Sequence, residues 1–202
     1  MSNAVFTIGH STHAVEEFVR LLARHGVTRI ADVRSSPYSR QNPQFNRETI
    51  ALALGRAGIT YVFLGAELGA RSKDRACYVN GKVRYDLLAG TALFQRGLER
   101  ITQDSREHVV AIMCAEKDPL ECHRTILISR RLAERGVEVR HILADGGLET
   151  HDAAVARLLA ELDLPDHDLF RSREEIVEEA YRKRGEAIAY ADDAQTDGAG
   201  LS

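Results

Sequence analysis

The stretch 114–124 concentrates side chains that can do chemistry. It holds two thiols, Cys114 and Cys122, together with the imidazole of His123, the guanidinium of Arg124 and the carboxylate of Glu116. A thiolate is a nucleophile and a metal ligand, an imidazole transfers protons, and arginine captures carboxylate or phosphate groups. The residue types in this stretch therefore predict a functional site.

The flanking sequence predicts how this stretch is positioned. It follows a wholly apolar run, 109–113, which is typical of a strand buried on both faces of a parallel sheet. Asp118, Pro119 and Glu121 have the pattern of an N-cap, a first helical residue and a capping box. We therefore expect a strand that ends at the first thiol and a helix that begins at Pro119.

On one continuous helix, Cys122, His123 and Arg124 would point in directions about 100° apart. All three cannot face the same crevice, so we expect Cys122 to pack beneath the helix. Cys114, at the end of a strand and near a helix N-terminus, is placed for thiolate stabilisation by the helix dipole and nearby cations. Its alternative role is that of a small, inert apolar filler.

Polar side chains also follow two earlier predicted strands. After the first, His10 is a candidate general base and Ser11 an anion contact or a helix cap. After the second, Asp32 could orient a neighbouring side chain or accept backbone donors in the turn. Arg34 suits phosphate or carboxylate capture, with an internal ion pair to Asp32 as the alternative.

Strands and helices alternate five times along the chain, which predicts a three-layer α/β/α sandwich with a mainly parallel five-stranded sheet. Because parallel strands end at one edge of a sheet, the polar residues above are expected to converge there. Asn80-Gly81 predicts a small hairpin insertion. The expected strands are 5–8, 28–33, 59–64, 109–113 and 137–143, and the hairpin flap spans about 76–86.

The expected organisation is one α/β domain, 1–190, with a C-terminal helix at about 173–189 and a disordered tail at 191–202. Hydrophobic residues at 44% and charged residues at 28% are ordinary for a globular protein. No apolar run is long enough to span a bilayer and the N-terminus lacks a signal pattern, so we expect a cytoplasmic protein without a membrane partner. Three cysteines are too few for a disulfide framework and indicate reduced thiols.

Four motifs occur in order along the chain: Thr7-Ile8-Gly9-His10-Ser11, then Asp32-Val33-Arg34 with Pro37 and Ser39, then Gly58-Ile59 with Tyr61 and Leu68-Gly69, and finally Cys114-Ala115-Glu116 with Asp118-Pro119 and Cys122-His123-Arg124. Together they resemble the motifs of the family defined by domain of unknown function 488 (DUF488). The resemblance covers roughly residues 6–142 and implies an α/β sandwich with its motif residues at one edge. It implies no activity, so function must be argued from the site.

These residues predict an enzyme that acts on a small anionic or nucleotide-like substrate, although the reaction class is unknown. A non-catalytic ligand- or nucleic-acid-binding module is the alternative, but a net charge of −3 does not support nucleic acid. The oligomeric state is not indicated. The candidate catalytic residues are His10, Cys114 and His123, and the candidate substrate-binding residues are Ser11, Asp32, Arg34, Glu116 and Arg124.

The cofactor is unknown, because no nucleotide-cofactor motif is present. A metal ion held by Cys114, Cys122 and His123, with His10 as a fourth ligand, is a further alternative. It is not favoured, because the two cysteines are separated by seven residues, whereas most structural zinc sites have a pair of cysteines only a few residues apart. Adjacent Cys122 and His123 on a helix also rarely bind the same ion.

Overall fold

The computed structural model describes residues 4–192, and a six-stranded sheet lies at their centre. The strand order is β3-β2-β6-β1-β7-β8; the first five strands are parallel, and β8 runs antiparallel to β7. The predicted α/β/α class and the small hairpin are confirmed, whereas β8 adds a sixth strand. The strands are β1 (Val5–Gly9), β2 (Arg29–Asp32), β3 (Thr60–Phe63), β6 (Val110–Cys114), β7 (Val139–Ile142) and β8 (Leu148–Thr150).

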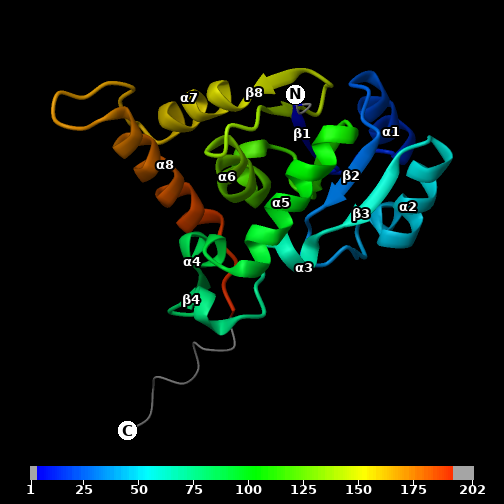
Figure 1. The fold of residues 1–202 in the computed structure, drawn as a ribbon, viewed down its shortest axis with the longest axis horizontal. Helices are drawn as coiled ribbons and strands as arrows, with labels where there is room; N and C mark the ends of the chain where they lie inside the picture. Colours follow the sequence, from blue (N-terminus) through cyan, green and yellow to red (C-terminus); the bar gives the residue numbers. More distant parts are fainter. Residues whose placement is uncertain (1–3, 193–202) are drawn as a thin grey trace, which may run out of the picture.

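Helices cover both faces of this sheet (Figure 1). On one face lie α1 (Val15–Arg24) and α2 (Arg47–Arg56), whose apolar residues form one core with the sheet. On the other face lie α5 (Ala92–Glu107) and the π-helix η4 (Arg124–Ser129), which continues into α6 (Arg130–Ala133). All five residues of β6 are buried and alternate between the two cores, as expected for a central strand.

The helices form where apolar residues recur every three or four positions. In α1 the buried residues are Phe18, Leu21 and Leu22, and in α5 Phe94, Leu98 and Ile101 are among them. Thr91 caps α5 by accepting a hydrogen bond from the Phe94 amide. The shorter helical segments are η1 (Pro43–Phe45), α3 (Gly65–Leu68), η2 (Arg75–Cys77), α4 (Tyr85–Ala89) and η3 (Pro119–Glu121).

A third, smaller core lies between α7 (His151–Glu161) and α8 (Arg173–Ile188) at one end of the molecule (Figure 1). A capping box of Ser172 and Glu175 starts α8, which accounts for its sharp beginning. Within the described part of the chain, no helix is both long and apolar enough to cross a membrane.

The predicted flap is the hairpin of β4 (Tyr78–Val79) and β5 (Lys82–Val83). Its turn residues, Asn80 and Gly81, have φ of 50° and 73°, the left-handed conformation that Asn-Gly turns favour. The segment after α8 pairs with this hairpin: Val83 N donates to the Tyr190 carbonyl at 3.0 Å, and Ala191 forms a β-bridge with Lys82. Apart from Ala191 and Asp192, the tail predicted to be disordered lies outside the described residues.

A buried chain of hydrogen bonds links β1 and β7 to α7 and α8. Thr7 Oγ1 lies 2.8 Å from His141 Nδ1, His141 Nε2 lies 3.1 Å from His151 Nδ1, and His151 Nε2 lies 2.9 Å from the Tyr181 hydroxyl. The ring-to-ring bond needs one protonated and one unprotonated nitrogen, so the two imidazoles cannot both carry a second proton while it is intact. The hydroxyls of Thr7 and Tyr181 can each donate or accept, so they fit either direction of the chain.

We predict that acid weakens the fold through these two histidines. Burial lowers the pKa of His151 to about 4 and holds the pKa of His141 well below its usual value. The unfolded chain takes up these protons below its histidine pKa of about 6.5. The free energy of unfolding should therefore be fully retained above about pH 6.5 and fall as the pH drops from there toward about 4. Urea unfolding between pH 7.5 and 5 measures this.

His151→Gln should reduce that pH dependence, because it removes one titrating ring. His167, whose side chain is 88% exposed, provides the control His167→Gln, which should behave like the wild type. A stability that stays constant from pH 7.5 to 5 would contradict the prediction.

Candidate functional site

Strand β6 ends at the point where the topology opens a crevice. Its neighbours β1 and β2 are each followed by a helix on one face of the sheet, whereas the chain after β6 passes to the other face. Loops that diverge in this way leave space for a ligand at the carboxyl ends of the strands. The predicted convergence of strand ends is therefore present.

Backbone hydrogen bonds join the three loops at this edge. His10 N donates to the Cys114 carbonyl at 2.9 Å, Ser11 N donates to the Ala115 carbonyl at 2.9 Å, and Val33 N donates to the Met113 carbonyl at 3.1 Å. The loops after β1 and β2 are thus held directly against the end of β6. Side chains far apart in the sequence are brought to one place by main-chain bonding.

The prediction that a helix begins at Pro119 is wrong. Asp118 caps only a single 3₁₀ turn, η3, and the backbone at Cys122 is extended, with φ −138° and ψ 139°. Helical geometry resumes at His123 and continues as the π-helix η4. Local bonds explain the break, because Cys122 Sγ accepts from the Arg124 amide at 3.4 Å and its thiol lies 2.9 Å from the Glu116 carboxylate.

This break brings the thiol of Cys122 and the ring of His123 to the same point as Cys114. His123 Nδ1 lies 3.6 Å from Cys114 Sγ and 3.9 Å from Cys122 Sγ. All three residues are buried. The expectation that Cys122 and His123 point in different directions is wrong, because it assumed a continuous helix. The extended backbone at Cys122 interrupts that helix.

The cluster is electrostatically coupled. A hydrogen bond to Cys122, with burial, raises the pKa of Cys114 well above its usual value. Burial opposes the charged form of Cys122 as well, but the hydrogen bond from Cys114 and the nearby Arg124 lower the pKa of Cys122 well below its usual value. Burial and the adjacent Cys122 raise the pKa of Glu116. Of the two thiols, Cys122 therefore loses its proton more readily than Cys114.

Arg124 is fully buried and braces the loop after β6 from behind. Its Nη1 donates to the Glu116 carbonyl at 2.7 Å and its Nη2 donates to the Lys117 carbonyl at 3.2 Å. Gly9 lies against the same carbonyl, since a Cβ at this position would be 1.8 Å from the Glu116 oxygen. The structure thus places Arg124 under the loop and away from the pocket lining, so an anion contact by this side chain remains only a prediction.

Arg34 and Asp32 form a buried ion pair, the alternative that the sequence left open. Arg34 Nε and Nη2 donate to the two carboxylate oxygens of Asp32 at 2.9 and 2.7 Å, and the Tyr61 hydroxyl donates to Asp32 at 2.6 Å. Arg34 Nη1 lies 3.3 Å from His10 Nε2, and His10 Nδ1 lies 2.9 Å from the Ser11 carbonyl. Burial lowers the pKa of His10 to about 4, so its ring is neutral and both nitrogens are engaged.

A pocket of about 380 Å³ opens above Cys114, and we call it the Cys114 pocket. The buried residues Cys114 and His123 lie at its inner end, and Arg34 and the more exposed Glu116 also line it. His10 and Arg124 do not line it, and Ser11 lines a separate hollow near Asp118. Of the predicted site residues, the pocket therefore brings together four.

Several pocket residues were not among the sequence predictions. Ser35 and Ser36 belong to the polar loop after β2, so their position next to Arg34 was the available signal. Arg71 follows the third strand, where parallel topology could have pointed to it. The other lining residues come from distant segments without a local signal, namely Tyr38, Ala70, Tyr85, Ala115, Glu121, Ile188 and Tyr190.

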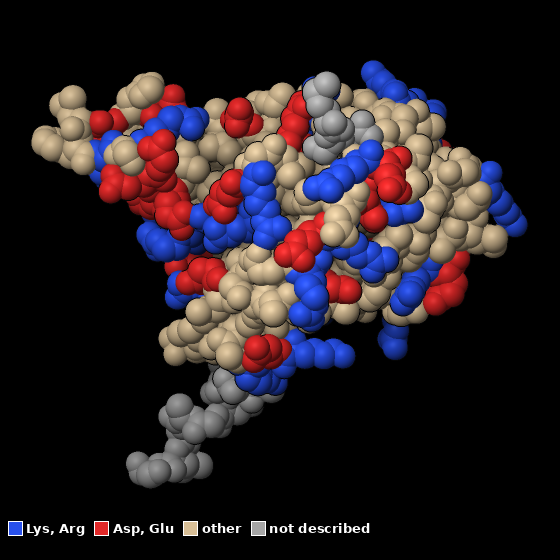
Figure 2. All heavy atoms as spheres, in the orientation of Figure 1, with Lys and Arg blue, Asp and Glu red and all other residues tan. Residues whose placement is uncertain are grey.

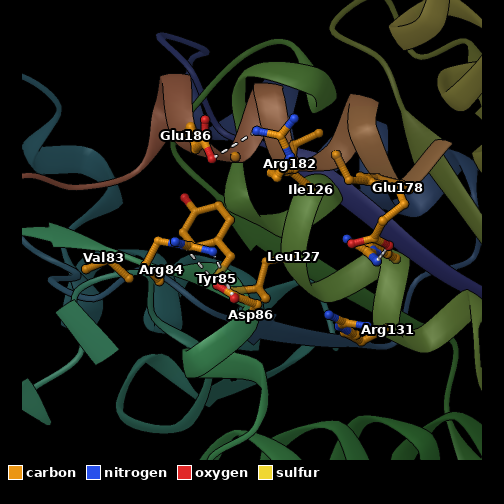
Figure 3. A pocket seen from close by; sticks show the side chains of 13 residues that line it. Val83, Arg84, Tyr85, Asp86, Ile126, Leu127, Arg131, Glu178, Arg182 and Glu186 are labelled. Atoms are coloured by element: carbon orange, nitrogen blue, oxygen red, sulfur yellow. Dashed lines mark hydrogen bonds and ion pairs between the residues drawn. The ribbon is translucent and has the colours of Figure 1, made fainter. Parts of the chain in front are cut away.

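A smaller cavity of about 90 Å³ lies between α4, η4 and α8 (Figure 3). Six of its seven charged side chains are paired with one another, namely Arg84 with Asp86, Arg182 with Glu186, and Arg130 with Glu178, and the seventh, Arg131, pairs with Glu134. Nothing in this lining resembles the thiol and imidazole groups of the Cys114 pocket. The thiol and imidazole groups therefore line the Cys114 pocket at the carboxyl end of β6 and not this smaller cavity.

The fold and the site define a doubly wound α/β protein with a buried cysteine–histidine cluster where strand β6 ends. The family model described as "Domain of unknown function DUF488" matches residues 14–130, which is over half of the chain. The chain therefore belongs to the DUF488 family, and the predicted resemblance is confirmed. The searches of curated proteins and of solved structures found no match.

We predict that Gly9→Ala disrupts the site, because its methyl group would overlap the Glu116 carbonyl that Arg124 also holds. Overpacking of this kind typically costs about 1–3 kcal/mol. Urea unfolding measures the loss of stability. Gly55→Ala in α2 is a matched control with no atom within 4 Å of the new methyl, and it should be neutral or slightly stabilising. Equal stabilities of the two variants would contradict the proposed packing.

Proposed function

We propose that the protein is an enzyme that acts on a small anionic substrate bound in the Cys114 pocket. One observation carries the proposal: arginine, serine and glutamate side chains line a cavity of about 380 Å³ together with a buried thiol and a buried imidazole. Pockets that combine convergent polar groups with reactive side chains are the usual setting of active sites.

Arg71 is the main candidate for the anion contact. Its guanidinium lies 4.6 Å from the centre of the Tyr190 ring, and its backbone amide donates to Ser35 Oγ at 2.9 Å. Within residues 4–192 it forms no ion pair, so its charge is available to a ligand. Arg34, although paired with Asp32, adds a second cation to the same wall, and Ser36 supplies a hydroxyl.

Cys114 and His123 are the groups best placed to react with a bound ligand, because both line the pocket and lie 3.6 Å apart. Glu116 lies beside them and can contact the ligand. His10, the other predicted catalytic residue, uses both ring nitrogens within the protein. We therefore assign His10 a positioning role, in which it holds Arg34.

A small ligand suits the surface better than nucleic acid does. On the face shown in Figure 2, lysine and arginine are mixed with aspartate and glutamate over the whole surface. A continuous basic stripe, the usual footprint of nucleic-acid binding, is not visible there. A nucleotide or another small phosphate or carboxylate compound would need only the charge of Arg71 and Arg34.

We predict that Arg71→Gln weakens anion binding about tenfold or more, as expected for loss of a charged hydrogen bond. Calorimetric titration with inorganic phosphate, AMP and citrate measures this, and chromatography of the incubated ligands measures turnover. Arg56→Gln, an exposed arginine in α2, is the control and should bind like the wild type.

Absence of binding for all three anions, or equal binding by Arg71→Gln and the wild type, would refute anion recognition at this pocket. A ligand that binds but is recovered unchanged after incubation supports the alternative of a non-catalytic binding module. Turnover that survives in Cys114→Ser would contradict a role for this thiol.

A further inference from the structure

Cys114 and His123 at the inner end of the Cys114 pocket, with Cys122 beside them, have the spacing of a metal site. The sulfur atoms of Cys114 and Cys122 and a ring nitrogen of His123 all lie within 4.8 Å of one another. A tetrahedral zinc ion with Zn–S near 2.3 Å and Zn–N near 2.0 Å holds its sulfur and nitrogen ligands about 3.5 Å apart. The corresponding separations here are 3.6 and 3.9 Å. The two sulfur–nitrogen separations are thus within about 0.4 Å of those in such a site, and the two sulfurs lie within 4.8 Å of each other.

The orientation of His123 fits a metal ligand. Its Nε2 lies 3.2 Å from the Val33 carbonyl, a group that can only accept a hydrogen bond. In the neutral ring, Nε2 therefore carries the proton and Nδ1 presents its lone pair to the two sulfur atoms. A backbone carbonyl that fixes the tautomer of a ligating histidine is the common outer partner in metal sites.

The local charges also fit a cation. Around one buried point the protein gathers two thiols, the lone pair of His123 and the carboxylate of Glu116, whose oxygen lies 2.9 Å from Cys122 Sγ. The nearest buried cation, Arg124, directs Nη1 and Nη2 at backbone carbonyls. A divalent ion would neutralise two thiolates and replace hydrogen bonds between weak thiol donors.

We propose that Cys114, Cys122 and His123 bind one thiophilic divalent cation, zinc or ferrous iron, at the inner end of the pocket. Two cysteines and a histidine supply three ligands of the type both ions accept. Cys114 and His123 line the pocket together with Glu116. The fourth position therefore faces Glu116 and the pocket, an arrangement that suits a site open to ligand rather than a closed structural one.

This inference goes beyond the proposed function, and the two can fail separately. The metal ligands lie at the inner end of the pocket, whereas Arg71 lies on its wall and touches none of them in the contacts described above. Arg71→Gln should therefore load metal like the wild type even if it loses phosphate binding. Metal loading without any anion binding would leave the cation site intact and refute the proposed function.

Elemental analysis of the full-length chain, purified without chelators, tests the proposal. We expect about one zinc or iron ion per chain, and a roughly tenfold or greater loss in Cys122→Ser and in His123→Gln. The control is Cys77→Ser, which removes the third buried thiol of the chain, outside the cluster, and should leave the metal content unchanged.

Cobalt provides a readout that does not depend on the variants folding. Wild-type protein stripped of metal and titrated with Co²⁺ should develop thiolate-to-cobalt charge-transfer absorption and the strong visible bands of tetrahedral cobalt. A wild type that carries no metal and shows no such bands would overturn the proposal in favour of hydrogen-bonded thiols. Cys122→Ser that binds metal as fully as Cys77→Ser would also overturn it.

Discussion

The pairing of β6 with β1 on one side and β2 on the other is the interaction on which the rest of the site depends. These are backbone hydrogen bonds, so they fix the register of the strand ends at Gly9, Asp32 and Cys114 independently of the side chains. The bonds continue one residue beyond the strands, from His10 and Val33 to the end of β6. The sheet therefore fixes where the site residues begin, and the loops that carry them extend only a short way beyond the strands.

Glu116 shows how one residue can serve both the scaffold and the site. Its carbonyl is gripped between Gly9 and the guanidinium of Arg124, while its carboxylate is directed at the sulfur of Cys122. The backbone contact is close-packed and leaves no room for a side chain on Gly9. The packing behind the loop thus fixes the backbone from which the carboxylate of Glu116 reaches Cys122.

Much of this arrangement was predictable from the sequence, for reasons that differ between elements. Long apolar periodicities, as in α1 and α5, and the buried run of β6 gave the layers, and parallel topology gave the convergence of His10, Arg34 and Cys114. The fate of Cys122 was not predictable, because the capping signals at Asp118 and Pro119 are the same for a single 3₁₀ turn and for a helix. The short strand β8 and the contribution of Tyr190 depend on tertiary contacts that leave no local pattern.

Tyr190 lines the pocket but lies outside the region of the chain that matches the family model. The pocket residues Cys114, Glu116 and His123 lie within the matched family region, 14–130, whereas Ile188 and Tyr190 on the outer side of the pocket lie after it. The segment that carries Tyr190 is attached to the hairpin by main-chain bonds, which tolerate many side chains. The matched region therefore supplies most of the pocket lining, and a change of side chain at 188 or 190 would alter the shape of the pocket while leaving the cysteine–histidine cluster in place.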